Sequence, residues 1–172
     1  HENGVNSLDA SVEFLKIDTK LREFVERIKD TDTVLIVTAD HGFIDTSEEN
    51  TIRWEDHLEF LDCLTLPLCG DYRSLFCYIH PDMKEKFIEY WEDELSDYCE
   101  IHKSLDLVEE GYFGLFEPNP KFLDRIGDYV LVMKDNYIMF DTLPNEDDHF
   151  IVGNHGGVSS KEMYVPLSVI EL

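Results

Sequence analysis

The chain has 172 residues, about the length of one ordinary domain, and carries 38 acidic against 14 basic residues, a formal charge of −24. With 43% hydrophobic residues it has enough apolar material for a core, which excludes a disordered acidic tail. The negative charge also argues against extended DNA or RNA as a partner, because binding a polyphosphate depends on Lys and Arg.

No run of about 18 apolar residues occurs, and no signal-peptide pattern opens the chain, so the sequence predicts neither a membrane segment nor a visible leader. The four cysteines include no C-x-x-C pair, which predicts ordinary buried or half-buried thiols. Such thiols favour a reducing, cytoplasmic location. The sequence gives no indication of an oligomeric state.

The first predicted element is an amphipathic helix over residues 7–29, because apolar side chains recur every three or four positions. Residues 33–37 then form a short, continuously apolar run rich in β-branched side chains. Such a run is typical of a strand covered on both faces within a parallel sheet. The predicted fold class is therefore α/β, with a mixed or mostly parallel sheet flanked by helices.

The middle of the chain predicts a smaller α+β region. Strands are expected at residues 75–79 and 99–102, and helices at 82–95 and 105–110. Two further strands, 129–133 and 137–140, flank a polar break that predicts a hairpin turn. We interpret residues 56–142 as an inserted cap beside the main sheet.

The last part of the chain mixes polar loops with one short helix and one strand. The acidic loop over residues 144–149 is interpreted as a solvated charge cluster, because it lacks the glycine-containing spacing of a calcium loop. Ser159 and Glu162 have the spacing of a capping box, which predicts a helical turn that stops before Pro166. A final strand is expected near residues 167–170.

The segment Thr-Ala-Asp-His-Gly at residues 38–42 follows the first predicted strand directly. Ligands of open α/β sheets bind beyond the carboxyl ends of strands, where the loops diverge. The side chains of Asp40 and His41 can serve one site there if the chain turns at Gly42. Carboxylate and imidazole together suit zinc or a similar divalent ion. The alternative is an Asp–His hydrogen bond that only closes a surface turn.

A second candidate segment is Gly-Asn-His-Gly-Gly at residues 153–157, where three glycines let the backbone approach a bound ion around His155. A third is the start of the chain, with His1 ahead of Gly4. Taken singly, the glycine segment indicates a plain turn with an incidental histidine, and a histidine at the first position is also what the remnant of a purification tag leaves.

Taken in order, the three segments resemble the alkaline phosphatase superfamily, and within it the type I phosphodiesterase/nucleotide pyrophosphatase family. The resemblance rests on His-x-x-Gly, a helix, an apolar strand ending in Thr-Ala-Asp-His-Gly, and Asn-His-Gly-Gly-x-Ser-x-x-Glu-Met-x-Val-Pro-Leu. It covers about residues 1–43 and 151–170. It implies that residues 1–55 and 143–172 form the C-terminal part of a metal-dependent catalytic domain of the alkaline phosphatase type.

The resemblance also implies residue roles. Enzymes of this family hold two metal ions, usually zinc. By motif match, His1 and His155 correspond to ligands of one ion, and Asp40 and His41 to ligands of the other. Asn154, beside His155, is a candidate contact for a small phosphate-ester or nucleotide substrate. Arg73, Tyr72, Trp54 and Phe43 are weaker candidates for substrate contacts and are equally compatible with structural roles.

The chain departs from the family pattern in what it lacks. The family nucleophile, a Thr or Ser, and the remaining Asp ligands belong to motifs expected upstream of His1, and Ser7 and Ser11 do not replace the nucleophile. No catalytic nucleophile is therefore assigned within this chain. Because a stable zinc site usually needs at least three protein ligands, we expect weak or partial metal occupancy and no turnover by the 172-residue chain alone.

Two groups of alternatives stay open. A phosphomonoesterase, a phosphonate hydrolase or a sulfatase of the same superfamily could use a similar metal frame. A non-catalytic acidic binding module, in which the Asp, Glu and His side chains only form a solvated surface, is an alternative of another class.

Overall fold

The structure is a computed structural model, and it describes residues 1–140 and 150–172. The chain forms two compact units, one comprising His1–Asp45 with His149–Leu172 and the other Thr46–Asp148. The assignment of residues 56–142 as a cap, and of the flanking 1–55 and 143–172 as catalytic, concerns function and stays a prediction. The acidic loop at residues 144–149 lies outside the described residues.

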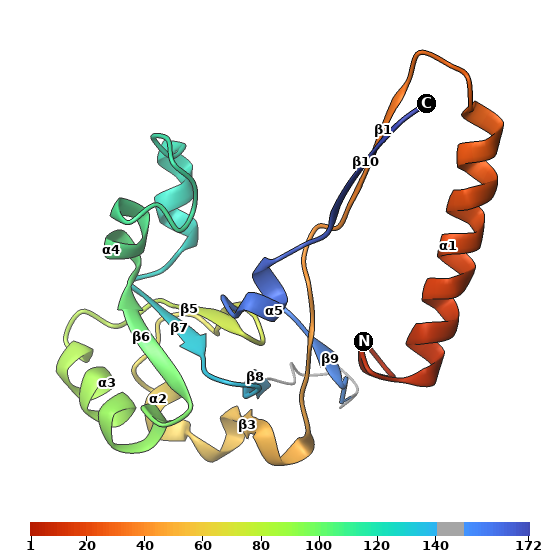
Figure 1. Cartoon of the computed structure of the whole chain (residues 1–172). Helices are drawn as coiled ribbons and strands as arrows, with labels where there is room; N and C mark the ends of the chain where they lie inside the picture. The colour runs from red at the N-terminus through yellow and green to blue at the C-terminus, as the bar shows by residue number, and fades with distance from the viewer. Residues whose placement is uncertain (141–149) are drawn as a thin grey trace. The chain divides into compact units, whose positions relative to one another are not determined.

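The first unit begins with the predicted helix, α1, which spans Leu8–Ile28 (Figure 1). Ser7 caps it, because its hydroxyl accepts a hydrogen bond from the backbone N–H of Ala10 at 3.1 Å. None of the helix side chains is buried, and Phe14 is 70% exposed. The periodicity therefore predicted the helix correctly, while its apolar side chains stay open to solvent.

The predicted strand that follows is β1 (Val34–Thr38), and it pairs antiparallel with β10 (Leu167–Glu171) in a two-stranded ribbon (Figure 1). The expected mixture of helices and strands is confirmed, but the sheets of the described residues are small and mostly antiparallel, so a mostly parallel sheet is wrong. Burial of this strand on both faces is wrong as well, since Ile36 is 60% exposed. An apolar run predicts a strand, but it contains no information on the direction of the strand that pairs with it.

A pair of short strands and one helical turn complete the first unit. β2 (Ile44–Asp45) pairs antiparallel with β9 (Gly153–Asn154). The helical turn α5 (Ser160–Met163) begins at the predicted capping box, in which the Ser159 and Glu162 side chains each bond to the other's backbone N–H.

The second unit contains a four-stranded antiparallel sheet in the order β4-β5-β7-β6. Its strands are β4 (Cys69–Asp71), β5 (Ser74–Cys77), β6 (Cys99–Lys103) and β7 (Tyr129–Met133). A separate pair, β3 (Thr51–Arg53) and β8 (Ile138–Phe140), is parallel. Every residue of β7 is buried, as a central strand requires.

Helices and helical turns complete the second unit. They are α2 (Leu58–Leu61), α3 (Lys84–Tyr90) with its π-helical continuation Trp91–Leu95, α4 (Ser104–Glu109), and the 3₁₀ turns Glu48–Asn50, Trp54–Asp56 and Pro120–Arg125. None of the described helices is both long and apolar enough to cross a membrane.

The predicted hairpin between β7 and β8 is wrong. A turn does lie between them, since the backbone N–H of Tyr137 donates to the carbonyl oxygen of Lys134 at 3.0 Å. However, β7 pairs with β5 and β6, and β8 pairs with β3. A polar break indicates where the chain turns, but the partner of each strand depends on segments far away in the sequence.

The core of the second unit contains a cluster of aromatic rings among aliphatic side chains. Phe60 stacks on Trp54 with ring centroids 5.5 Å apart and lies 4.8 Å from Phe87, and all three are buried. All four cysteines are free; three are buried as expected, whereas Cys69 is exposed.

Candidate functional site

Three histidines from distant parts of the sequence surround one phenylalanine in the first unit. The rings of His1, His41 and His155 have centroids 4.9, 5.0 and 5.2 Å from the Phe43 ring, each at a steep angle to it. His41 and His155 also stack face to face, with centroids 3.9 Å apart and planes 20° apart. The structure therefore brings together the three histidines that the sequence motifs single out.

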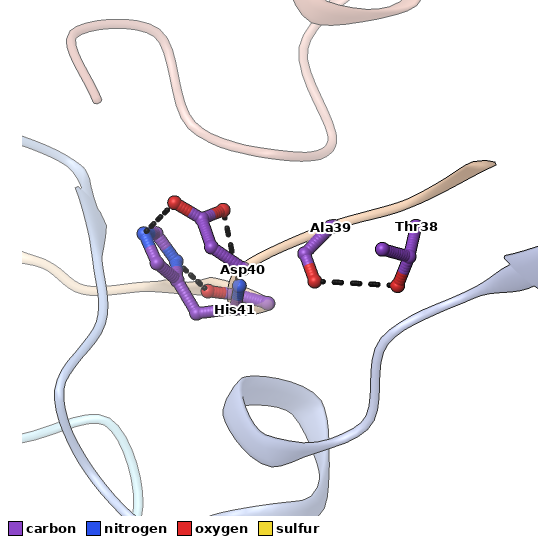
Figure 2. A network of polar contacts seen from close by, with 5 residues as sticks. Thr38, Ala39, Asp40 and His41 are labelled. Carbon is purple, nitrogen blue, oxygen red and sulfur yellow. Dashed lines mark hydrogen bonds and ion pairs between the residues drawn. The ribbon is translucent and has the colours of Figure 1, made fainter. Parts of the chain in front are cut away.

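Asp40 and His41 lie directly beyond β1, where the chain leaves the ribbon (Figure 2). The Asp40 side chain is 89% exposed, and its Oδ1 accepts from the backbone N–H of His41 at 3.1 Å. Its Oδ2 lies 3.7 Å from Nε2 of His41, too far for a direct hydrogen bond (Figure 2). The Asp40 carboxylate therefore bonds to the backbone of its neighbour, so the alternative of an Asp–His hydrogen bond that closes the turn stays open.

Backbone carbonyls fix the orientation of two of the imidazoles. Nδ1 of His1 lies 2.9 Å from the carbonyl oxygen of Gly153, and Nδ1 of His41 lies 2.9 Å from that of Gly42 (Figure 2). Because a carbonyl oxygen only accepts, Nδ1 must carry the proton in both rings. In the neutral tautomer, the lone pair then lies on Nε2, the arrangement typical of metal-binding histidines.

The start of the chain is held in place by contacts within the first unit. The carbonyl oxygen of His1 accepts from the backbone N–H of Gly153 at 2.7 Å, so His1 and Gly153 bond to each other twice. The Asp45 carboxylate accepts from the backbone N–H of Val5 at 2.6 Å and from Nδ2 of Asn6 at 3.1 Å. The position of His1 therefore depends on two separate anchors, one at each end of the segment of residues 1–6.

One of the two predicted ligand pairs has a donor-atom separation close to that of ligands on one metal ion. With Zn–N and Zn–O distances of about 2.0–2.2 Å, two tetrahedral ligand atoms lie roughly 3.4 Å apart. The 3.7 Å between Asp40 Oδ2 and His41 Nε2 is close to that separation. Among residues 1–140 and 150–172, however, no group of three or more His, Cys, Asp or Glu side chains could hold a metal ion. The donor atoms are thus chemically suitable, but fewer than three converge.

The residues predicted to contact substrate lie in both units, where other parts of the chain hold their side chains. Asn154 is buried, and its Nδ2 donates to the carbonyl oxygen of Ile151 at 2.9 Å, so its amide stabilises its own loop; a role in substrate binding stays a prediction. In the second unit Arg73 is buried and donates to the carbonyl oxygen of Tyr137 at 2.5 Å. Trp54 belongs to the aromatic core, and the Tyr72 ring packs against Phe140.

Sequence reasoning missed the residues that support the cluster. The sequence offers Phe43 as a substrate contact or a structural residue, and it does not predict that this ring packs against all three imidazoles. Nothing in the sequence singles out Asp45, and Glu162 stands out as a helix cap and as part of the family-like motif. The position of Asp45 in the sequence carries no signal of its contacts, because its partners lie about 40 residues earlier.

The chain matches a known family of hydrolases. A model of the type I phosphodiesterase/nucleotide pyrophosphatase family matches residues 1–158, and the chain belongs to this family, in the alkaline phosphatase superfamily. It covers only part of the catalytic domain of that family. Members of the family typically depend on zinc. No curated protein sequence matches the chain.

Solved structures show a similar fold. Human ectonucleotide pyrophosphatase/phosphodiesterase 5 matches with a TM-score of 0.76 and 21% identity over 98% of this chain and 43% of its own. The murine protein, in an inactive variant solved in complex with AMP, gives 0.70 and 20% over 97% and 42%. Phosphonoacetate hydrolase from Sinorhizobium meliloti, in complex with phosphonoformate, gives 0.66 and 19% over 98% and 42%. The chain therefore spans less than half the length of these relatives.

Proposed function

We propose that this chain is part of a metal-dependent hydrolase of phosphodiester or nucleotide pyrophosphate bonds, and that it supplies half of the ligands for two metal ions. The observation that carries the proposal is the packing of His1, His41 and His155 around Phe43. Membership in the family supports the reaction class. A small phosphate ester or a nucleotide is the proposed substrate, supported by the AMP complex of a relative.

The ring planes support the division of the ligands into two pairs. The lone pairs of an imidazole lie in its ring plane, so the nearly parallel rings of His41 and His155 cannot direct them at one common ion. His1 and His155 are tilted by 59° with centroids 5.4 Å apart, which allows their lone pairs to converge. We therefore assign His1 and His155 to one ion, and Asp40 and His41 to the other.

Two bound zinc ions would neutralise charge on the phosphoryl oxygens and lower the pKa of the attacking hydroxyl. The residues of this chain orient the imidazole ligands. The carbonyl oxygens of Gly153 and Gly42 accept from Nδ1 of His1 and His41, so that Nε2 of each ring is available to bind a metal ion. The nucleophile and the remaining ligands are proposed to lie in the part of the family domain that this chain does not cover.

The first test measures zinc binding by the 172-residue chain in competition with a chromophoric chelator. We expect weak binding, because each ion would have only two protein ligands, and a loss of at least about tenfold in His41→Ala and His155→Ala. His102→Ala is the matched control, since His102 lies in the other unit beside Glu100. Equal zinc affinity in all variants would overturn the metal assignment.

The second test concerns turnover. The pure chain should not hydrolyse bis(4-nitrophenyl) phosphate with added zinc, and strong hydrolysis would contradict our placement of the nucleophile. For a longer protein that contains this chain, a panel of diesters, monoesters, phosphonates and sulfate esters would distinguish the proposed activity from the other reactions of the superfamily. Unchanged metal content and activity in its Asp40→Ala and His155→Ala variants would instead favour a non-catalytic binding module.

A further inference from the structure

Glu162 has a buried carboxylate that accepts hydrogen bonds from Gly157 and Ser159, in and just after the glycine loop that carries His155. Glu162 is only 2% exposed to solvent. Oε1 accepts from the backbone N–H of Gly157 at 2.8 Å. Oε2 accepts from the hydroxyl of Ser159 at 2.6 Å and from its backbone N–H at 3.3 Å. A helix cap alone explains the bonds to Ser159, but not the bond to Gly157.

The backbone of the same residue holds the turn that carries His41. The carbonyl oxygen of Glu162 accepts from the backbone N–H of Gly42 at 2.7 Å. The contact is so close that a Cβ at Gly42 would lie 1.9 Å from the carbonyl oxygen of Lys161. The side chain and the main chain of Glu162 thus attach the turn of His41 and the loop of His155 to one short helical turn.

We propose that Glu162 is a positioning residue that sets the face-to-face stacking of His41 and His155. Its contacts account for their separation of 3.9 Å, because the two rings come from segments more than a hundred residues apart and both segments are bonded to Glu162. His1 is bonded to Gly153, at the opposite end of this glycine loop from Gly157, and its segment is also held by Asp45. The predicted effect of Glu162 on metal binding rests on the proposed function, whereas its predicted effect on the stacking of the two rings does not.

The carboxylate suits this position because each of its oxygens faces a donor. Gln has the same shape, but its NH₂ group would face either Gly157 N–H or the Ser159 donors, so one buried donor would lose its acceptor. Glu162→Gln therefore removes part of the contact set with little change in volume. Glu162→Ala removes all of the side-chain bonds and leaves the main-chain bond to Gly42 in place.

The test is NMR of the whole 172-residue chain with labelled histidine rings, which reports ring-to-ring nuclear Overhauser effects. In Glu162→Ala we expect loss of the His41–His155 effect while the His1–Phe43 effect remains. Glu162→Gln should weaken the first effect selectively. Glu171→Ala, which removes an exposed carboxylate in the same unit, should change neither. Retention of the His41–His155 effect in Glu162→Ala would overturn the proposal, and so would loss of both effects together in Glu162→Gln, because that indicates general unfolding.

A second variant perturbs the same junction from the other side. Gly42→Ala pushes the turn of His41 away from the helical turn while Glu162 stays intact, so it should also abolish the His41–His155 effect. Rings that remain stacked in Gly42→Ala would contradict the proposal even if Glu162→Ala failed to fold.

Zinc titration separates this proposal from the proposed function. If the wild-type chain binds zinc, Glu162→Ala should bind it about 10- to 100-fold more weakly, the range typical of groups that orient metal ligands. An unchanged affinity in that variant would overturn the role of Glu162. If the wild-type chain binds no zinc, the metal assignment fails, while the NMR result still decides whether Glu162 positions the two rings.

Discussion

Replacing Phe43 by alanine should loosen the histidine cluster without disturbing the second unit. Phe43 makes three edge contacts with imidazole rings, at 4.9, 5.0 and 5.2 Å. Aromatic pairs contribute about 0.5–1.5 kcal/mol each beyond the area they bury, so the three together amount to roughly 1.5–4.5 kcal/mol. Because the Phe43 side chain is only half-buried and its partners are polar, we expect a loss in the lower part of this range, about 2 kcal/mol.

The assay is amide hydrogen exchange at Gly42, whose N–H donates to the carbonyl oxygen of Glu162. A loss of about 2 kcal/mol corresponds to roughly 30-fold faster exchange of this amide, because 1.36 kcal/mol is a factor of ten. Phe113→Ala is the control: Phe113 also contacts two aromatic rings, but in the second unit. Unchanged exchange at Gly42 in Phe43→Ala, or equal acceleration in both variants, would refute the reasoning.

Three further predictions concern the second unit. Gly127→Ala should destabilise it by more than about 2 kcal/mol in thermal or urea unfolding, since Gly127 has φ +62° and a Cβ would lie 2.5 Å from the carbonyl oxygen of Cys77; an unchanged midpoint would contradict this. Iodoacetamide should modify Cys69 alone in the native chain, because the other thiols are buried, and mass spectrometry should detect a single adduct. Burial lowers the pKa of His57 against the opposing effects of Asp56 and Glu94, so the unfolded state binds the proton more readily. The contribution of neutral His57 to the free energy of unfolding is therefore complete above its ordinary pKa of about 6.5, and it is lost as the pH falls through the lower pKa of the folded state. His57→Gln should reduce this acid sensitivity, which unfolding measured at several pH values would detect.

The local elements of the fold could be predicted from the sequence because their signals are local. Apolar spacing located α1, and the pair Ser159 and Glu162 located α5. The direction and partner of each strand could not be predicted in this way. β1 pairs with a segment more than 120 residues later, and β8 pairs with β3 rather than with its neighbour β7, because pairing depends on contacts between distant segments.

In the candidate site, too, the sequence predicts some residues and not others. Asp40, His41 and His155 could be singled out because each stands in a short motif, and His1 because the order of these motifs resembles a family. Their supports could not be found in this way: the contacts of Asp45 with Val5, and of Glu162 with Gly42, join residues 40 and 120 positions apart.

The sequence by itself determined which candidate ligand groups the chain offers, since imidazole and carboxylate side chains are chemically suited to divalent ions. Only the tertiary structure decided which of them meet. The packing of three imidazoles on Phe43, and the bonds of Glu162 to two separate loops, depend on distances in space that no pattern along the chain encodes.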